Sequence, residues 1–531
     1  MSHDNDPRRL PLRQEWTAFW TRGRALAVLA AMLVMVAGAV LAAMPPRASC
    51  SQGTVETPCP ADPIGPQGAG VTDRLAFAHR TLEGDGSITA RLTSFTGIIT
   101  YPPPDHDEIV AGLVPWAKTG VIIKDGTRPG SRYAALMMTG RHGVHLQHDY
   151  VNDVEGSAGA VTPKAPRWLR LTRAGELVTG EESPDGSTWT TVGSVHLAGL
   201  PTTVEVGLFA TSPGDQTLRS AALGASTVET RFTQASGTFD HVLTTGAVSP
   251  NAWDADLVGE MGATDWERLH RAPGLTVSGD TLTVTGSGDI GPVGEVGEAH
   301  LESLLRGLPI ALLILIVVAA SARHGGASPR RRVRARGAVV AAAGLVAGLI
   351  GTGASVVVGV TLATVNGTPM APTSWLTELR VVAGVGALAA ASCLIALAAA
   401  ELMGRRGAAA ALSAVAVVLL HLVTALPLLP DEVARWILRV TPAAGFSVTQ
   451  TRVDYPQVLA HTAPFEGFYP LPWWAGLAVT WLYAVGATAM VIRRRPRPSG
   501  LSGEKLMHQR LARSERRKYA GAPELATDKP R

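Results

Sequence analysis

The sequence predicts a polytopic α-helical membrane domain of six transmembrane helices, joined to an all-β sandwich held outside the membrane. Three observations indicate this fold class: six apolar runs, clusters of arginine that alternate with them, and a long polar stretch rich in turn signals. Of the 531 residues, 46% are hydrophobic and only 17% are charged, which is too apolar for a typical soluble enzyme. The length suggests about two to four structural units.

Each apolar run is long enough to cross a bilayer as a helix, which takes about 20 apolar residues. The first run carries no charge, and because 24 residues precede it, a cleaved signal peptide fits it poorly. The other five runs follow one another in the stretch 304–492. The predicted transmembrane segments are residues 25–44, 304–320, 338–363, 381–400, 408–429 and 472–492.

The arginine clusters set the predicted orientation, since loops rich in Lys and Arg stay in the cytoplasm. Clusters precede the first span and follow the second, fourth and sixth spans. We therefore expect a plasma-membrane protein with both termini cytoplasmic (segment 1–24 and the basic tail 493–531) and with residues 45–303 extracellular. The clustered residues are Arg8, Arg9, Arg13, Arg22, Arg24, Arg323, Arg330, Arg331, Arg332, Arg334, Arg336, Arg405, Arg406, Arg493, Arg494, Arg495 and Arg497.

Two of the three cysteines agree with this orientation. Cys50 and Cys59 lie in a Pro/Gly-rich segment just outside the first span. Because an exported compartment permits disulfides, we predict that they form one. A metal site there would need further ligands, which nearby residues do not supply. Cys393 lies within the fourth span and is interpreted as a small packing residue.

The extracellular region at 45–303 is predicted to form β structure, because turn signals recur at short spacing between short apolar or alternating runs. Six consecutive pieces also resemble a concanavalin-like (laminin-G-like) jelly roll of bacterial surface proteins. These pieces are GDGSITARLTS, WAKTGVIIKD, GSRYAALMMT, WLRLTR, SPDGSTWTTVGSVHLAGLP and VEVGLFATS. The resemblance covers residues 71–239, between an extracellular linker at 45–70 and a membrane-proximal β-rich segment at 240–303.

The resemblance implies carbohydrate binding as one role, although a fold does not fix a function. Trp116, Trp168 and Trp189 are candidates for stacking on sugars, and core packing is the alternative. The Glu-x-Asp-x-x-Glu strand of a related glycosidase family is missing, and Glu181 and Glu182 are interpreted as solvated surface. The loop at 105–108 could bind Ca²⁺ through its oxygens, but we favour an ordinary polar loop.

The segment before the first span has the pattern of an amphipathic helix at the inner membrane surface, with Leu12, Trp16, Phe19 and Trp20 on one face. This segment, PLRQEWTAFWTRGR, resembles the entry helix of actinobacterial ABC-2-type transporter permeases. The stretches TVTGSGDI, TPAAGFSVTQ, YPQV and YPLPWWAG also resemble members with large ectodomains. The family has short re-entrant helices before its last span, and residues 431–440 have the amphipathic spacing for one, with Val433, Trp436, Ile437 and Val440 on one face.

This resemblance implies a permease subunit, which is not itself an enzyme and works with a separate ATP-binding cassette subunit, usually as a homo- or heterodimer. The sequence agrees that ATP is bound elsewhere, because it lacks the G-x-x-x-x-G-K-[ST] loop. We expect no cofactor in this chain. The candidates for coupling to the ATPase are Trp16, Phe19, Trp20, Ser328, Pro329, Arg330 and Arg331.

Two functions remain open. The leading hypothesis is an exporter permease whose ectodomain meets substrate, cell-wall glycan or an external partner. The alternative is a membrane-anchored binding or sensory protein that has lost coupling, because the loop after the second span keeps Ala-Ser-Pro-Arg-Arg at 327–331 but lacks most of the element that precedes it in the family. No nucleic-acid motif appears, and topology and anionic lipid account for the arginines.

Within the spans, two features stand out. Gly344 and Gly348, with Gly351 and Gly353, would let helices approach closely, either within one subunit or between two. His421 is an ionisable residue deep in a span and hence a functional candidate. We favour the interpretation that His421 is neutral and bonded to a backbone carbonyl.

Overall fold

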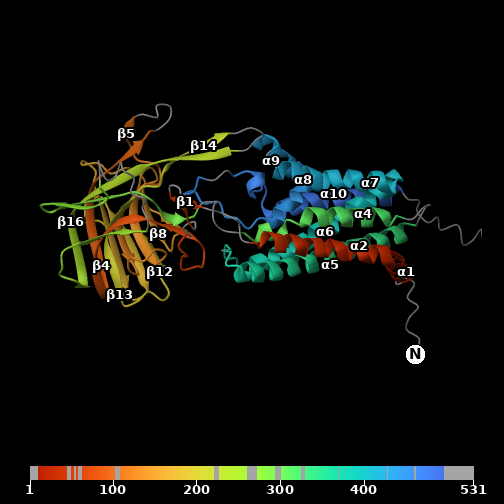
Figure 1. The fold of residues 1–531 in the computed structure, drawn as a ribbon, viewed down its shortest axis with the longest axis horizontal. Coiled ribbons are helices and arrows are strands. Elements are labelled where there is room, and N and C mark those ends of the chain that lie inside the picture. The colour runs from red at the N-terminus through yellow and green to blue at the C-terminus, as the bar shows by residue number, and fades with distance from the viewer. Residues whose placement is uncertain are drawn as a thin grey trace, which may run out of the picture.

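In a computed structural model, the chain forms a β-sandwich domain at one end and a bundle of long helices at the other (Figure 1). The structure describes residues 10–44, 50–52, 55–57, 62–101, 108–220, 226–259, 272–293, 300–323, 329–368, 370–426, 428–459 and 462–494. Cys59 lies outside these residues, as does the predicted calcium loop apart from Glu108, so the predicted disulfide and Ca²⁺ site are not described.

The predicted polytopic helical domain is confirmed, with six helical segments long and apolar enough to cross a membrane. Two of these segments combine several elements: η2 with α4, and α7 with η3 and α8. The helices are α1 (Leu10–Phe19), α2 (Arg22–Ala42), η2 (Leu301–Leu305), α4 (Leu308–Ser321), α5 (Arg330–Val365), α6 (Trp375–Met403), α7 (Arg406–Ala414), η3 (Val415–Leu419), α8 (Leu420–Ala425), α9 (Asp431–Val440), η4 (Pro442–Thr449), η5 (Pro464–Glu466) and α10 (Trp473–Arg494).

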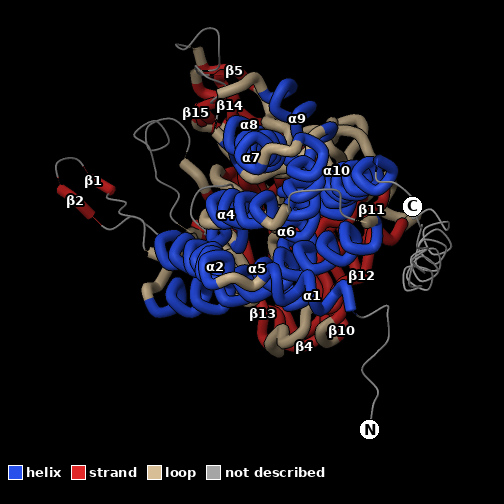
Figure 2. Tube along the Cα trace, turned by 90° about the vertical axis from the view of Figure 1, so that its right-hand side faces the viewer, coloured by secondary structure: helices blue, strands red, loops and turns tan. Residues whose placement is uncertain are grey.

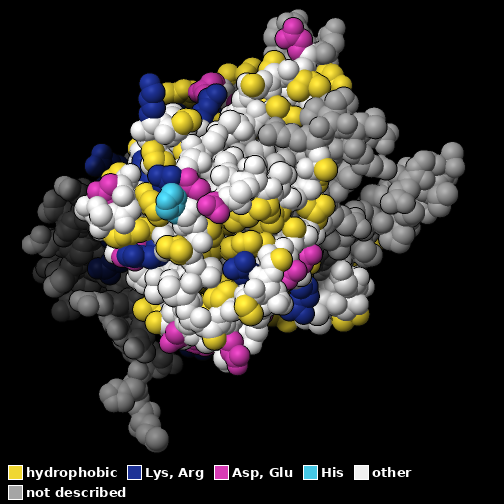
Figure 3. Space-filling model, turned by 90° about the vertical axis from the view of Figure 1, so that its left-hand side faces the viewer, with side chains coloured by type: hydrophobic (Ala, Val, Ile, Leu, Met, Phe, Trp, Pro, Cys, Tyr) yellow, Lys and Arg dark blue, Asp and Glu magenta, His cyan; other side chains and the backbone are white. Residues whose placement is uncertain are grey.

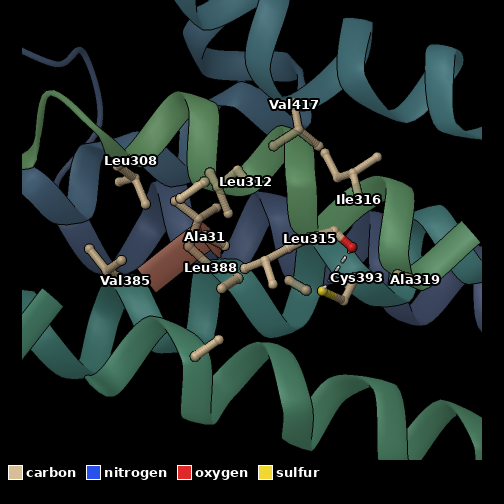
Figure 4. Close-up of a cluster of buried hydrophobic side chains, with 14 of the residues drawn as sticks. Ala31, Leu308, Leu312, Leu315, Ile316, Ala319, Val385, Leu388, Cys393 and Val417 are labelled. Carbon is tan, nitrogen blue, oxygen red and sulfur yellow. Dashed lines mark hydrogen bonds between the residues drawn. The ribbon is translucent and has the colours of Figure 1, made fainter. Parts of the chain in front are cut away.

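Helix α6 lies at the centre of the bundle, in contact with α4, α5, α7 and α10 (Figure 2). Its apolar side chains, with those of α2 and α4, form most of the main buried cluster, to which Leu315, Leu388 and Val417 belong (Figure 4). Cys393 is buried there, with its Sγ 3.9 Å from the carbonyl oxygen of Leu315. Helices α2 and α10 instead expose Leu29, Leu33 and Leu482, as helices facing lipid would.

Helix α5 is longer than a membrane requires. At 36 residues it spans about 54 Å, against a hydrocarbon core of about 30 Å. The excess is the Arg-rich first part, which extends the helix beyond the apolar region at the end far from the sandwich. Toward its middle, Gly344 and Gly348 allow the backbone of α6 to approach closely, so these glycines pack helices within one subunit.

The chain between the fifth and sixth spans folds back toward the bundle. Helix α9 covers the residues predicted for a re-entrant helix, and the buried 3₁₀ segment η4 follows it and packs against α6 and α10. The buried side chains of α9 are Ala434 and Leu438. Its predicted apolar face points outward, with Trp436 58% exposed, as expected for an amphipathic helix at a lipid surface.

The β domain is an antiparallel sandwich built around one very long strand, β4, which bends through the domain and pairs with β10, β13, β16 and β17. Along the main sheet the order is β12-β11-β10-β4-β13-β6-β7-β8-β9. The strands are β1 (Cys50–Gln52), β2 (Val55–Thr57), β3 (Val71–Asp73), β4 (Leu75–Thr100), β5 (Ile109–Ala111), β6 (Lys118–Lys124), β7 (Tyr133–Thr139), β8 (Val144–His148), β9 (Asn152–Glu155), β10 (Arg167–Ala174), β11 (Leu177–Ser183), β12 (Thr190–His196), β13 (Thr203–Thr211), β14 (Asp215–Ser220), β15 (Ser226–Arg231), β16 (Thr233–Val248), β17 (Asp254–Val258), β18 (Gly274–Ser278), β19 (Thr281–Gly286) and β20 (Ile290–Pro292).

Strand β16 crosses residue 239, which is the predicted boundary between the jelly roll and the membrane-proximal segment. The strands after it join the same domain, since β19 pairs with β16 and β20 pairs with β3. The hairpin β14–β15 extends from the sandwich toward α9 (Figure 1). On the face turned away from the helices, charged and apolar side chains are interspersed (Figure 3).

Strands β6 and β7 are buried on both faces, which gives the domain two interiors. On one face, Val121, Leu136 and Leu146 belong to the main sandwich core. On the other, Ile122, Ala135 and Met137 pack beneath β3 and β20, together with several polar side chains. This second, mixed face lies where the sandwich meets the helical domain.

The glycine contacts give a matched test of the bundle. A Cβ at Gly348 would lie 2.7 Å from the Cα of Gly386, whereas a Cβ at Gly353 meets nothing within 4 Å. We expect Gly348→Ala to destabilise the protein by about 1–3 kcal/mol through overpacking. Gly353→Ala should be neutral or slightly stabilising, because alanine favours helix. Thermal melting in detergent measures both, and equal melting temperatures would contradict the packing described.

Candidate functional site

Two polar sites stand out, one at each end of the helix bundle. The first lies at the end far from the sandwich, where α1 packs across α5. Of the aromatic residues predicted to couple to an ATPase, Phe19 is buried and Trp16 is 47% exposed. Trp20 bridges them, with its ring centroid 5.6 Å from that of Trp16 and 5.1 Å from that of Phe19. One side of α1 thus anchors the helix while Trp16 faces outward.

A buried ion triad fixes α1 to the bundle. Arg336 on α5 donates from Nε to Glu15 on α1 over 2.9 Å and from Nη1 to Glu401 on α6 over 2.8 Å. All three side chains are at most 8% exposed. Because a buried charge is stable only when it is paired, the triad joins three helices at this end of the bundle.

Arg24 at the start of α2 connects α1, α2 and α4. Arg24 donates to the carbonyl oxygens of Ala18 and Phe19 and to both oxygens of Ser321 at the end of α4. Among the other coupling candidates, Ser328 lies outside the described residues. Pro329 precedes α5, and Arg330 and Arg331 form its first turn, where Arg331 is exposed. Trp16 and Arg331 therefore lie at the same end of the bundle.

The triad predicts a large effect from removing its only cation while keeping the volume of the side chain. Arg336→Met would remove the buried cation that Glu15 and Glu401 share, and the half-exposed Arg332, whose Nε lies 3.8 Å from Glu15 Oε1, would compensate for it only in part. We expect a loss of about 3–5 kcal/mol in stability, because uncompensated buried charge is strongly destabilising.

The triple variant Glu15→Gln, Arg336→Met, Glu401→Gln should recover part of this loss, since it removes the unpaired charges as well. Thermal unfolding in detergent distinguishes the two. A triple variant no more stable than Arg336→Met would contradict the electrostatic explanation.

The second site is the mixed face of strands β6 to β9. Lys124 is fully buried there, 2.7 Å from Asp73 Oδ2, to which Tyr150 also donates over 2.6 Å. Burial lowers the pKa of Lys124, and the charge of Asp73 opposes that shift. This network joins β3 to β6 and so holds β3 over the mixed face.

Next to this network, a side chain from the helical domain enters the sandwich. Gln457 Oε1 accepts from Gln147 Nε2 over 2.7 Å and from Lys118 Nζ over 3.4 Å. Its Nε2 donates to Asp153 Oδ2 over 3.4 Å. Lys118 and Gln147 are fully buried, and Lys118 is also paired with Asp289 at 2.6 Å. Gln457 therefore joins the two domains through three hydrogen bonds, two accepted by Oε1 and one donated by Nε2.

The segment that carries Gln457 is also held by the helical domain. Arg452 pairs with Glu302 at 2.9 Å, and Arg380 donates to the carbonyl oxygen of Gln450 over 2.7 Å. Between these anchors and the sandwich lies a cavity of about 190 Å³. Its lining includes Gln67 and Val151 from the sandwich domain and Thr373, Arg452 and Tyr455 from the helical domain.

The three candidate tryptophans are half-buried and lie in different surroundings. Trp116 stacks on His142 with ring centroids 4.2 Å apart and meets His145 edge-on at 5.5 Å. His145 in turn bonds Asp153 at 3.0 Å, so Trp116 lies beside the Gln457 site. Arg91 and His241 flank Trp168, and Arg170 covers Trp189 at 3.9 Å.

Two interpretations of single residues are corrected. Glu182 is not solvated surface: it is 4% exposed and accepts from both the backbone nitrogen and the hydroxyl of Ser157, because β11 turns it inward. His421 is held by stacking, since its ring lies 3.6 Å from that of Phe446 and nearly parallel to it. Its Nδ1 has no hydrogen-bond partner among the described residues.

Sequence reasoning gave no site role to Gln457, Gln147, Lys118 or Arg336, although Arg336 was among the arginines that set the predicted orientation. One signal was available: Lys118 and Lys124 bracket an apolar strand on the same face, which marks buried lysines that need partners. The two glutamines have no such signal, because Gln147 and Gln457 bond each other across 310 residues of the chain. Among the described residues, no group of three or more His, Cys, Asp or Glu side chains could hold a metal ion.

The His145–Asp153 pair predicts a pH dependence. Burial by itself would lower the pKa of His145, but the hydrogen bond and charge of Asp153 outweigh it, and the pKa lies above the ordinary 6.5. The protonated pair therefore stabilises the fold fully below pH 6.5, and this contribution is lost as the pH rises through the folded-state pKa.

His145→Asn keeps a hydrogen-bond donor near the position of Nδ1 but does not titrate. We expect the stability difference between the wild type and this variant to shrink as the pH rises above 6.5. Thermal unfolding from pH 5 to 9 measures it, and a difference that does not change with pH would contradict the assignment.

No protein-family model matches the chain, and no curated protein matches it. Among solved structures, a functionally unknown protein from Saccharomyces cerevisiae is 13% identical with a TM-score of 0.22, covering 39% of this chain and 95% of its own. Scytalido-glutamic peptidase with a transition-state analogue inhibitor is 10% identical with a TM-score of 0.24, covering 40% and 98%. Likenesses this low carry no argument about fold or function.

Proposed function

We propose that this chain is the membrane-spanning permease subunit of an ABC-type exporter, powered by a separate ATP-binding subunit. The buried triad Glu15–Arg336–Glu401 is the observation that carries the proposal. It makes α1 a rigid part of the bundle, so a force applied to α1 reaches α5 and α6 directly. An amphipathic helix fixed in this way would suit the attachment of an ATPase.

The distribution of charge supports the same orientation. Exposed arginines gather at the α1 end, and the β sandwich lies at the other end of the helices (Figure 1). Under the positive-inside rule, the α1 end is cytoplasmic and the sandwich is extracellular, where it meets substrate, cell wall or a partner. The exposed apolar sides of α2 and α10 then face lipid or a second subunit.

One observation favours a second candidate, a membrane-anchored binding or sensory protein without ATPase coupling. Helix α4 ends at Ser321 and α5 begins at Arg330, so the connection between them is short. In this candidate the sandwich binds a ligand and no nucleotide-binding subunit is attached.

Purification of the full chain in mild detergent from its native host distinguishes the two. For the exporter we expect a stoichiometric ATP-binding subunit and ATP hydrolysis in the preparation. Trp16→Ala combined with Arg331→Ala should lose both without lowering the melting temperature, because both side chains are exposed.

A matched control is Val277→Ala, which changes an exposed apolar residue of the sandwich and should keep the subunit and its activity. A preparation that is free of any nucleotide-binding subunit would contradict the exporter and favour the anchored binding protein.

A further inference from the structure

We propose that the exposed face of α4 is a binding site for one anionic phospholipid, whose phosphate is held by Arg24, Arg323 and Arg406. An acyl chain of this lipid lies along α4. The inference places the lipid in the cytoplasmic leaflet, and in that respect it rests on the orientation proposed above. It does not depend on the attachment of an ATPase.

The three arginines, here called the arginine cluster, come together at the end of α4. Arg24 on α2 donates from Nε to Ser321 Oγ over 3.1 Å and from Nη2 to the Ser321 carbonyl oxygen over 2.8 Å. Arg406, the first residue of α7, donates to the carbonyl oxygen of Arg323 over 2.6 Å. Arg323 donates in turn to the carbonyl oxygen of Gly404 over 2.9 Å. Three guanidinium groups from different parts of the chain are thus held around residues 321–323.

The positive charge of the arginine cluster is not neutralised by acidic side chains. Within the described ranges, the hydrogen bonds of the cluster go to backbone carbonyls and the Ser321 hydroxyl, and none goes to a carboxylate. The ends of α4 and α6 carry about half a negative charge each, which offsets about one of the three positive charges. By contrast, Arg336 in the nearby triad has two buried carboxylates as partners. The chemistry of the cluster therefore calls for an anion from outside the chain.

The geometry of the cluster suits a phosphate group. Arg323 and Arg406 each make a single hydrogen bond in the described part of the chain, so most of their N–H donors are left for a ligand. A guanidinium group donates two parallel hydrogen bonds to phosphate oxygens. The bonds to helix-end carbonyls also hold the arginines in place before a ligand arrives.

An exposed apolar stripe on α4 leads to the arginine cluster. Ile310 and Val317 are 55% and 58% exposed, and their spacing places them on one face of the helix. Leu313 and Ile314 are half-buried on the same face, and Ser321 follows one turn after Val317. The rise from residue 310 to residue 321 is about 16 Å, close to half of a hydrocarbon core of about 30 Å. The stripe therefore has the length of an acyl chain within one leaflet.

The surroundings of the stripe favour a lipid over a soluble acidic partner. Helix α4 packs between α2 and α7 (Figure 2). Both flanking helices also expose large apolar side chains, among them Leu26 and Leu29 on α2 and Leu412 on α7. A soluble acidic protein would meet the arginines alone, whereas a phospholipid covers the apolar stripe and neutralises the arginines together.

The bound phosphate would also act on the junction with α1. Arg24 donates to the carbonyl oxygens of Ala18 and Phe19 at the end of α1. A ligand that holds this guanidinium group stabilises the junction of α1, α2 and α4. The anionic lipid should therefore raise the melting temperature of the protein by mass action.

Native mass spectrometry of the full chain in mild detergent tests the proposal, with dioleoylphosphatidylglycerol as the probe and zwitterionic dioleoylphosphatidylcholine as its control. We expect one molecule of the anionic lipid to bind. Arg323→Gln combined with Arg406→Gln should weaken this binding about 25-fold, because each arginine contributes about a factor of five at an anionic headgroup.

A matched control removes the same charge at the same end of the bundle. Arg493→Gln combined with Arg494→Gln changes two exposed arginines of α10 and should bind the anionic lipid like the wild type. If the first double variant does not fold, Arg406→Gln alone replaces it, since this side chain is exposed, and a loss of about fivefold is then expected.

Four outcomes would overturn the proposal. Equal binding of the two lipids, or equal losses in the two double variants, would show only a general attraction between arginines and anionic lipid. Displacement of the lipid by millimolar inorganic phosphate would assign the cluster to a soluble anion. A dimer that is lost in the variant of Arg323 and Arg406, with lipid binding unchanged, would assign the face to a second subunit.

The measurement is independent of the proposed permease function. It needs neither ATP nor a second protein, and a detergent micelle has no inner or outer side. Failure to bind lipid therefore leaves the permease and its orientation untouched, and a preparation without an ATP-binding subunit leaves the lipid site untouched.

Discussion

The carboxamide of Gln457 is the interaction on which the relation between the two domains depends. It comes from the helical domain and is hydrogen-bonded by side chains of the sandwich, two of which, Gln147 and Lys118, are fully buried. Buried polar groups are destabilising when unpaired, and the Gln457 amide supplies the partner of Gln147 Nε2 and a further acceptor for Lys118, which Asp289 also pairs. The same contact makes the position of the sandwich sensitive to the segment that precedes α10, and hence to the membrane helices.

At the opposite end of the bundle, buried charged groups are paired with one another in the same way. Glu15, Arg336 and Glu401 satisfy one another where water is excluded, and they fix α1 to α5 and α6. Between the two ends, close helix contacts at Gly344 and Gly348 connect α5 with the central α6. The molecule thus has closely packed helices in its middle and one polar junction at each end.

The fold class followed from the sequence because its signals are local. Apolar runs of membrane length and repeated turn residues each act within about 20 residues, and the six helices and the sandwich are where these signals indicate. The amphipathic helix at α9 was predictable for the same reason. The polar junctions were not, because Gln457 and Gln147 are ordinary surface-type residues until folding brings them together. Glu182 was misassigned because the turn that follows it at 184–186 suggests exposure, whereas the strand places the side chain inward.

The central claim is that the two domains meet through the Gln147–Gln457 hydrogen bond. A double-mutant cycle on thermal unfolding tests it most directly, with Gln147→Ala, Gln457→Ala and the double variant compared with the wild type in detergent. The account predicts a coupling energy of about 0.5–1.5 kcal/mol between the two positions, as expected for a hydrogen bond between neutral groups. Strictly additive effects would show that the sandwich and the helical domain do not interact there, and would contradict the account.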